Sequence, residues 1–238
     1  MQNYDLALAR YLIFVAGAVN AGGFLAVAQY TSHMSGVVAS IADNMAIGNS
    51  HIALAGLGAL LSFLGGAACT AILVNWGRRQ LLNSVYALPL LVESILLLCF
   101  GIAGANLNIH MGLFVSMTVM LLCFIMGLQN ALITKISRAE IRTTHVTGLI
   151  TDMGIELGKL FYWNLARYPQ AAQKVIADKK KIRILASLVA LFFSGGVIGA
   201  LGFKYVGFGF TIPLAALVLL LAIMPIFDDV NSRLRKSN

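Results

Sequence analysis

Charged residues are scarce in this chain. Only 11% of its 238 residues are Asp, Glu, Lys or Arg, whereas about 25% are charged in a typical soluble domain. This shortage excludes an ordinary soluble globular protein. Hydrophobic residues make up 59% of the chain, and its mean hydropathy is +0.86. We therefore interpret the sequence as an all-α polytopic membrane protein.

Cysteines and cofactor motifs are also few. The three cysteines, Cys69, Cys99 and Cys123, all lie inside apolar runs, which is typical of packing residues rather than disulfides or metal ligands. No stretch resembles a P-loop, a dinucleotide-binding fingerprint or a CxxC zinc site. The sequence therefore predicts neither a cofactor nor a metal. It also has no large soluble segment that would favour a membrane scaffold or sensor.

Acidic residues are outnumbered by basic ones, and the formal net charge is +8. We attribute this excess to cytoplasmic loops, which collect Lys and Arg in membrane proteins, and we expect no nucleic acid as a partner. The N-terminus lacks a basic region ahead of the apolar stretch Tyr11–Ala28. We therefore expect that stretch to be a first transmembrane helix rather than a cleaved signal.

Six segments are long and apolar enough to cross a bilayer, which takes roughly 20 residues. They are Tyr11–Ala28, Ile52–Val74, Val85–Ala105, Met111–Thr134, Ile182–Phe203 and Phe208–Phe227. Two further helical segments, Ser35–Gly48 and Thr147–Trp163, are shorter and carry acidic side chains. Neither fits a simple crossing.

A polar motif occurs twice in the chain, directly before these two short segments. Thr31–Gly36 and Thr143–Gly148 both read Thr-(Ser/Thr)-His-apolar-(Ser/Thr)-Gly, at an offset of 112. Each follows an apolar segment with the pattern Gly-x-x-Asn-Ala, at Gly17–Ala21 and Gly127–Ala131, an offset of 110. Matching motifs in matching order indicate an internal repeat.

The repeat continues beyond the motif. Leu61–Gly66 resembles Leu191–Gly196 at an offset of 130, and Leu88–Leu90 resembles Ile212–Leu214 at an offset of 124. Each half then consists of a long helix, the His motif, a short polar helix and two more long helices. We place the two transmembrane repeats at residues 10–105 and 111–228.

The distribution of basic residues indicates the topology. If both short helices crossed the membrane and the N-terminus were inside, Arg78, Arg79 and the Lys135–Arg142 loop would lie outside, against the positive-inside rule. The flipped orientation would instead place the basic residues between Arg167 and Arg183 outside, which is worse. If both are re-entrant, these loops and the Arg167–Arg183 loop lie inside, and only Lys204 remains outside. The sequence therefore predicts two inverted repeats, each with three transmembrane helices and one re-entrant half-helix. Both termini would be cytoplasmic.

Re-entrant helices would point their N-termini into the protein. Ser35 and Thr147 are N-cap residue types, and a helix N-terminus carries unpaired N–H groups and a partial positive charge that favour anions. We therefore predict a solute site at the midplane, although these side chains would also suit the simpler role of satisfying loop backbone. The predicted binding residues are Asn20, Thr31, His33, Ser35, Asn130, Thr143, His145 and Thr147.

The short helices also carry acidic residues at membrane depth. Such groups are costly, so we assign Asp43 and Asp152 to ion or proton coupling. Glu156 and Lys159 are spaced for a structural ion pair near the cytoplasmic surface. Glu93, in a long helix, either titrates or extends its carboxylate to the membrane surface, and its role is left open.

The paired motifs carry a family resemblance. Gly17–Ala21 with Thr31–Gly36, and Met126–Ala131 with Arg142–Asp152, are similar to the YoaK-type family of bacterial membrane proteins, grouped as a domain of unknown function. In that family the second motif usually has Tyr or His at the position of His145. The resemblance covers nearly the whole chain. It implies a bacterial inner-membrane location and no particular substrate.

Two function classes follow from these observations. The first is a transporter or channel for a small polar, anionic solute. The second is an intramembrane enzyme that uses His33, His145 and Asp152 as acid/base groups or metal ligands. Retention of both His motifs favours transport, since catalysis usually gives two copies distinct roles. The basic segment 170–183 is expected to rest on anionic lipid as an interfacial helix, and whether the protein forms an oligomer is left open.

Overall fold

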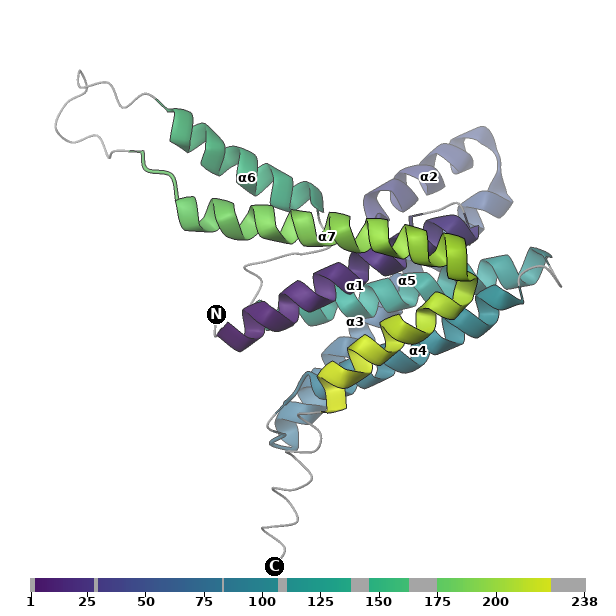
Figure 1. Ribbon diagram of the computed structural model, residues 1–238. Helices are drawn as coiled ribbons and strands as arrows, with labels where there is room; N and C mark the ends of the chain where they lie inside the picture. The colour runs from purple at the N-terminus through teal and green to yellow at the C-terminus, as the bar shows by residue number, and fades with distance from the viewer. Residues whose placement is uncertain are drawn as a thin grey trace, which may run out of the picture.

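The computed structural model describes residues 3–27, 30–82, 84–106, 111–137, 146–162 and 175–223. Within these ranges the regular structure is helical throughout, as expected (Figure 1). The α-helices are α1 (Asn3–Val27), α2 (Met34–Ile47), α3 (Ser50–Arg79), α4 (Ala87–Ala105), α5 (Met111–Ile136), α6 (Val146–Phe161) and α7 (Lys179–Val206). A 3-10 turn, η1 (Gly207–Phe210), and a helical segment at 211–223 follow α7.

Five stretches in the described part of the chain are long and apolar enough to cross a membrane, which makes this a multi-pass membrane protein. They are Leu6–Leu25, Ser50–Arg79, Ala87–Ala105, Ser116–Ile136 and Lys179–Ile223. The last one folds back at η1, where Gly207 has a φ of 65°, so it contains two of the six expected helices (Figure 1). The short α2 and α6 are not among the five.

The core lies between α1, α4, α5 and the segment 211–223, whose buried apolar side chains form one cluster. Helix α7 packs along α1, and α3 packs along α5. The outer face of α3 leaves large apolar side chains exposed, among them Leu54, Leu61 and Leu64 at 57–64% exposure. Such a surface is unfavourable in water and suits lipid.

Glycines allow the long helices to cross closely, and the same crossing occurs twice. A Cβ on Gly17 would collide with the Phe192 carbonyl oxygen, and a Cβ on Gly195 with the Phe14 carbonyl oxygen. This pair joins α1 to α7. Contacts this close between backbones require residues without a side chain.

The matching crossing joins α5 to α3. There, a Cβ on Gly127 would collide with the Phe63 carbonyl oxygen, and a Cβ on Gly66 with the Phe124 carbonyl oxygen. The first-helix residues in the two crossings differ by 110, as predicted, but the partner residues differ by 129 (195 − 66 and 192 − 63). The expected offset of 130 between the Gly-Gly pairs is therefore wrong by one residue. Residue identity in the motif aligns Gly66 with Gly196. In the structure, the residue that makes the equivalent helix crossing is Gly195.

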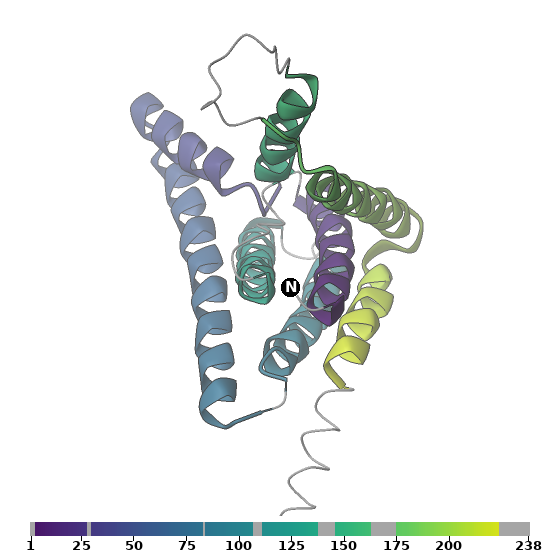
Figure 2. The same ribbon diagram turned by 90° about the vertical axis from the view of Figure 1, so that its left-hand side faces the viewer.

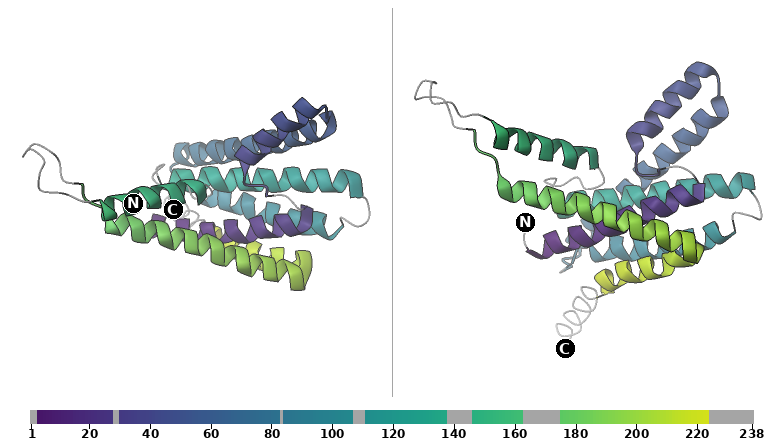
Figure 3. Two further views of the ribbon diagram at one scale, coloured as in Figure 1. Left: turned by 90° about the horizontal axis from the view of Figure 1, so that it is seen from above. Right: turned by 45° about the horizontal axis from the view of Figure 1, so that its top comes forward.

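The two short helices occupy similar places. Helix α2 packs on α3, and α6 packs on α7. In Figures 1, 2 and 3 the N-terminal ends of α2 and α6 lie toward the middle of the molecule, and the two helices then run apart toward its edge. Each short helix thus contacts the long helix that follows it in the chain.

Candidate functional site

A hollow of about 370 Å³ lies where α2 begins, between α2, α3 and α5. This volume is in the range of small-molecule sites. Its lining residues follow helical spacing on each helix, and we call it the α2 groove. They are Tyr30, His33, Gly36, Val37 and Ser40, then Ile52, Ala55, Gly56 and Ala59 from α3, then Ser116, Val119 and Met120 from α5.

The described lining is apolar apart from four side chains, those of Tyr30, His33, Ser40 and Ser116. It includes no Lys, Arg, Asp or Glu. The three hydroxyls and the imidazole can each donate a hydrogen bond. An apolar body with a few polar positions therefore fits this groove better than a strongly hydrated ion does.

His33 occupies the N-cap position of α2. Its carbonyl accepts the first helical hydrogen bond from the Val37 N–H at 3.1 Å, and no side chain caps the helix. The expectation that Ser35 is the N-cap is wrong, because Thr31 and Ser32 form the preceding turn and α2 begins at Met34. The Met34 N–H donates to the Ser32 carbonyl at 3.2 Å, so the N–H groups of Ser35 and Gly36, which face no capping side chain, are those left for a ligand.

Two glycines shape the groove. A Cβ on Gly36 would lie 3.0 Å from Nδ1 of His33, so the glycine that ends the motif leaves room for the imidazole ring. A Cβ on Gly56 would lie 2.7 Å from Cγ1 of Ile41, so Gly56 lets α2 approach α3. Both glycines therefore have a steric reason to be present.

The turn before α2 is fastened to α1. Ser32 Oγ donates to Asn20 Oδ1 at 2.8 Å, and Asn20 is only 9% exposed. Asn20 thus binds the loop that follows in its own half of the chain. Thr31 is buried, and its Oγ1 has no hydrogen-bond partner among the described residues. The structure therefore gathers Asn20, Thr31 and His33 around the start of α2.

The remaining predicted binding residues lie elsewhere. Ser35 is exposed, and Thr147 lies inside α6, which begins at Val146, so it is not the N-cap expected. Asn130 is half-buried on α5, and its carbonyl accepts from Thr134 Oγ1. Thr143 and His145 fall outside the described residues, as shown by the ranges given above.

The two acids predicted to couple ions do not line the α2 groove. Asp43 is exposed on α2, and Asp152 is half-buried on α6. The Asn44 side chain, next to Asp43, donates to the carbonyl oxygen of Ser40 at 2.8 Å. Within the described ranges no three His, Cys, Asp or Glu side chains are placed to hold a metal ion.

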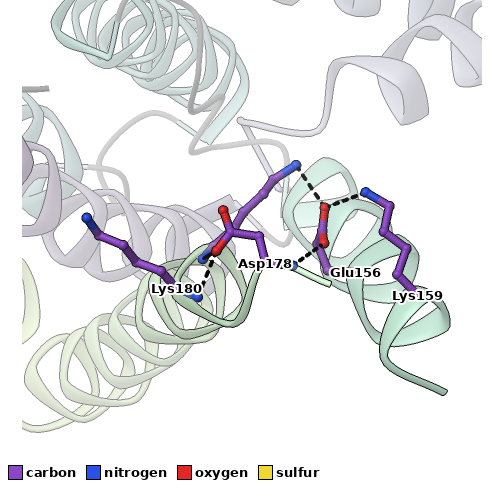
Figure 4. Close-up of polar contacts among 5 residues, drawn as sticks. Glu156, Lys159, Asp178 and Lys180 are labelled. Carbon is purple, nitrogen blue, oxygen red and sulfur yellow. Dashed lines mark hydrogen bonds and ion pairs between the residues drawn. The ribbon is translucent and has the colours of Figure 1, made fainter. Parts of the chain in front are cut away.

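Glu156 forms the polar link between α6 and α7 (Figure 4). Its side chain is buried and accepts from Lys159 Nζ at 2.9 Å and from the Asp178 backbone N–H at 3.0 Å. Lys181 Nζ lies 3.8 Å away. The backbone hydrogen bond and then Lys159 lower the pKa of Glu156. The predicted Glu156–Lys159 ion pair is thus present.

The basic segment at 170–183 differs from the interfacial helix expected. Residues 175–178 are not helical, and Lys179 already begins α7; residues 170–174 lie outside the described ranges. Asp178 caps α7 by accepting from the backbone N–H groups of Lys180 and Lys181 at 2.9 and 3.0 Å (Figure 4). This cap offsets the unfavourable position of lysines at a helix N-terminus. Contact with anionic lipid stays a prediction.

Sequence reasoning missed part of the groove. Ser40 shares a helix face with His33 at a spacing of seven, so a signal for it was present. Tyr30 and Ser116 had no such signal. Ser116 in particular enters the groove only because α5 from the second half packs against α3 from the first.

A family model described as a protein of unknown function (DUF1275) matches residues 8–224. The match covers both copies of the His motif and confirms the resemblance to a family of unknown function. No curated protein matches the chain, and no solved structure matches it.

Proposed function

We propose that this chain, which belongs to the DUF1275 family of proteins of unknown function, is a membrane transporter or channel for a small polar solute of anionic character. The observation that carries the proposal is the α2 groove. A hollow of small-molecule size lies within an apolar helical protein, at an uncapped helix N-terminus beside His33.

The anionic character rests on the chemistry of the groove. An uncapped N-terminus presents N–H groups and a partial positive charge, and His33, Tyr30 and the serines add further donors. No acidic residue among the described lining opposes an anion. A monoanion with a small apolar body satisfies both the donors and the apolar walls.

We also propose that the two halves are inverted repeats and that α2 and α6 are re-entrant. The duplicated glycine crossings and the central position of both N-terminal ends support this arrangement. In it, the α2 groove and the turn before α6 converge on one midplane site, where His145 would face the solute beside His33. Asp43 and Asp152 keep their proposed role in ion coupling.

Topology gives one test of the inverted arrangement. Single cysteines at Asn49 and Asn106 should react with a membrane-impermeant reagent added outside bacterial cells, because both positions would be periplasmic. A cysteine at Asn83 should not react, because its loop would be cytoplasmic. Labelling at Asn83 from outside would contradict inverted repeats in the inner membrane with cytoplasmic termini.

Ligand stabilisation tests the solute site itself. Purified protein would be heated with a panel of inorganic phosphate, sulfate, nitrate and short monocarboxylates. A ligand at about 100 times its Kd stabilises the folded state by about 2.7 kcal/mol, which a melting curve resolves. We expect at least one small anion to raise the Tm, with monocarboxylates the strongest.

His33→Ala should lose this Tm increase, whereas His51→Ala should keep it, because His51 is exposed on α3 outside the groove. An equal increase in both variants would exclude the groove as the site. Flux of the stabilising anion into proteoliposomes then separates transport from the alternative, an intramembrane enzyme built on His33, His145 and Asp152. Chemical conversion of the anion without flux would favour the enzyme.

A further inference from the structure

Glu93 lies in the middle of α4 and is completely buried, with 0% of its surface exposed. Neither carboxyl oxygen has a hydrogen-bond partner among the described residues. Of the two roles left open by the sequence, extension to the membrane surface is therefore excluded. A carboxyl group kept inside an apolar core without a partner needs another explanation.

Among the described residues, no charged group forms a hydrogen bond or an ion pair with Glu93. Helix α4 packs against α3, α5 and η1, and Ser94 donates to the Ala215 carbonyl in the segment 211–223. Residues 207–223 contain no titratable side chain. The titratable groups on α3 and the described part of α5, none of which bonds to Glu93, are His51, Cys69, Arg78, Arg79, Cys123 and Lys135.

The neighbouring helix α5 carries a second buried side chain with an unpartnered oxygen, that of Gln129. Tyr86 OH donates to the Lys135 carbonyl at 3.3 Å, which fixes the register between the antiparallel α4 and α5. Glu93 is seven residues after Tyr86 on α4, and Gln129 is six residues before Lys135 on α5. Gln129 is fully buried, its Nε2 donates to the Leu12 carbonyl at 3.1 Å, and its Oε1 has no partner.

We propose that Glu93 is a proton-binding site and that it carries its proton in this conformation. The carboxylate takes up one proton from the bulk solvent when α4 is open to it, and it releases that proton to the solvent when the site opens again. The neutral acid avoids an isolated charge in the core. Buried ionisable residues in membrane helices commonly serve this purpose.

If the chain is a transporter, as proposed above, protonation of Glu93 can be coupled to movement of the solute. Release of the proton requires water to reach α4, so protonation would favour the closed packing and deprotonation would favour opening. Glu93 would then be a further proton-coupling group, in addition to Asp43 and Asp152. Protonation of Glu93 itself does not depend on which solute is carried.

Infrared spectroscopy of the purified protein tests protonation directly. At neutral pH the wild type should show the carbonyl stretch of a protonated carboxylic acid, and Glu93→Gln should lack that band. The matched control is Glu156→Gln, which removes an ion-paired carboxylate and should leave the band in place. A wild-type spectrum with no protonated carboxyl, or a band that survives in Glu93→Gln, would overturn the proposal.

If the infrared band is too weak to assign, the pH dependence of the Tm tests protonation of Glu93 independently. If Glu93 is ionised in the unfolded chain and protonated in the folded one, folding of the wild type takes up one proton. Above the ordinary pKa of glutamate, the equilibrium constant for folding should therefore fall by about tenfold per pH unit. Glu93→Gln, which cannot bind this proton, should not show that fall. The variant should therefore gain Tm over the wild type as the pH rises. A constant difference would overturn the proposal, as would a loss of the pH effect when Na⁺ or K⁺ is added, which would indicate a cation site. Anion binding at His33 should persist in Glu93→Gln, so the two proposals fail separately.

Discussion

The two short helices begin with the same motif but have opposite surroundings. In the first half, Val37, Gly56 and Ala59 line an open groove between α2, α3 and α5. The offsets of 112 for the short helices and 129 for the long ones identify the corresponding positions in the second half. These are Leu149, Leu185 and Leu188, which are buried with Ile13 in a closed apolar cluster.

The polar contacts of the two short helices also differ, and α6 again has the more buried ones. Helix α2 has no buried residue, and the Asn44 side chain binds Ser40 on its own helix. At the position corresponding to Asn44, α6 has the buried Glu156, which binds Lys159, Asp178 and Lys181 (Figure 4). In the first half, Asn44 accepts from Asn49 at the junction of α2 and α3, whereas in the second half Glu156 joins α6 to the start of α7.

The two halves of the chain share some structural features and differ in others. The glycine crossings and the placement of the short helices occur in both halves, so they belong to the scaffold. The α2 groove opens beside the first short helix, whereas the corresponding described side chains of the second half fill a closed apolar cluster.

The largest loss of stability should come from substitutions at the glycine crossings, which occur in both halves. Gly17→Ala and Gly127→Ala each place a Cβ against a backbone carbonyl that cannot move aside, which costs about 1–3 kcal/mol or more. Both variants should lower the Tm and the yield strongly and to a similar extent. Gly154→Ala is the control, because its Cβ would meet nothing and an alanine favours a helix by about 0.5–1 kcal/mol. A mild effect in only one crossing variant would show that the crossings are not equivalent.

The next effect concerns the groove. Ala59→Leu introduces the residue found at the corresponding position 188 and should fill the groove. We expect solute affinity to fall by more than about tenfold, a loss of about 1.4 kcal/mol, while the protein stays folded. Ala68→Leu, on an exposed face of the same helix, should leave affinity unchanged. Full affinity in Ala59→Leu would place the solute elsewhere.

A smaller effect is expected at the α6–α7 link. Glu156→Gln keeps the shape but weakens the acceptor for Lys159 and the Asp178 N–H, so the Tm should fall at neutral pH. Because folding lowers the pKa of Glu156, its contribution exists above the ordinary glutamate pKa and disappears as the pH falls through the folded value. The difference in Tm between wild type and variant should therefore shrink in acid. A difference that grows in acid would contradict the assigned contacts.

Much of the fold could be predicted from the sequence because apolar length and motif spacing are local signals. The long helices and the short α2 and α6 followed from them, and the glycine crossings recur at the same offset of 110 between Gly17 and Gly127. The one-residue error at Gly66 and Gly195 has a physical cause. Several glycines are adjacent in each motif, and only the packing partner selects the one that must lack a side chain.

The site was less predictable, because it depends on contacts between distant segments. His33 was identified, yet Ser116 joins it in the groove only through the packing of α5 on α3. The N-cap position was misplaced since hydroxyl-bearing residues occur on both sides of His33. Burial of Glu93 likewise followed only from the packing around α4.

A double-mutant cycle on His33 and His145 tests the central claim most directly, using the anion that gives the largest Tm increase. The claim is that both loop-to-helix turns serve one solute, bound in the groove of the first half. His33→Ala and His145→Ala should each weaken binding, His33→Ala more strongly. The double variant should deviate from additivity by about 0.5–3 kcal/mol, as expected for residues that share a partner. Strict additivity, or full affinity in His145→Ala, would contradict the claim and leave two separate sites.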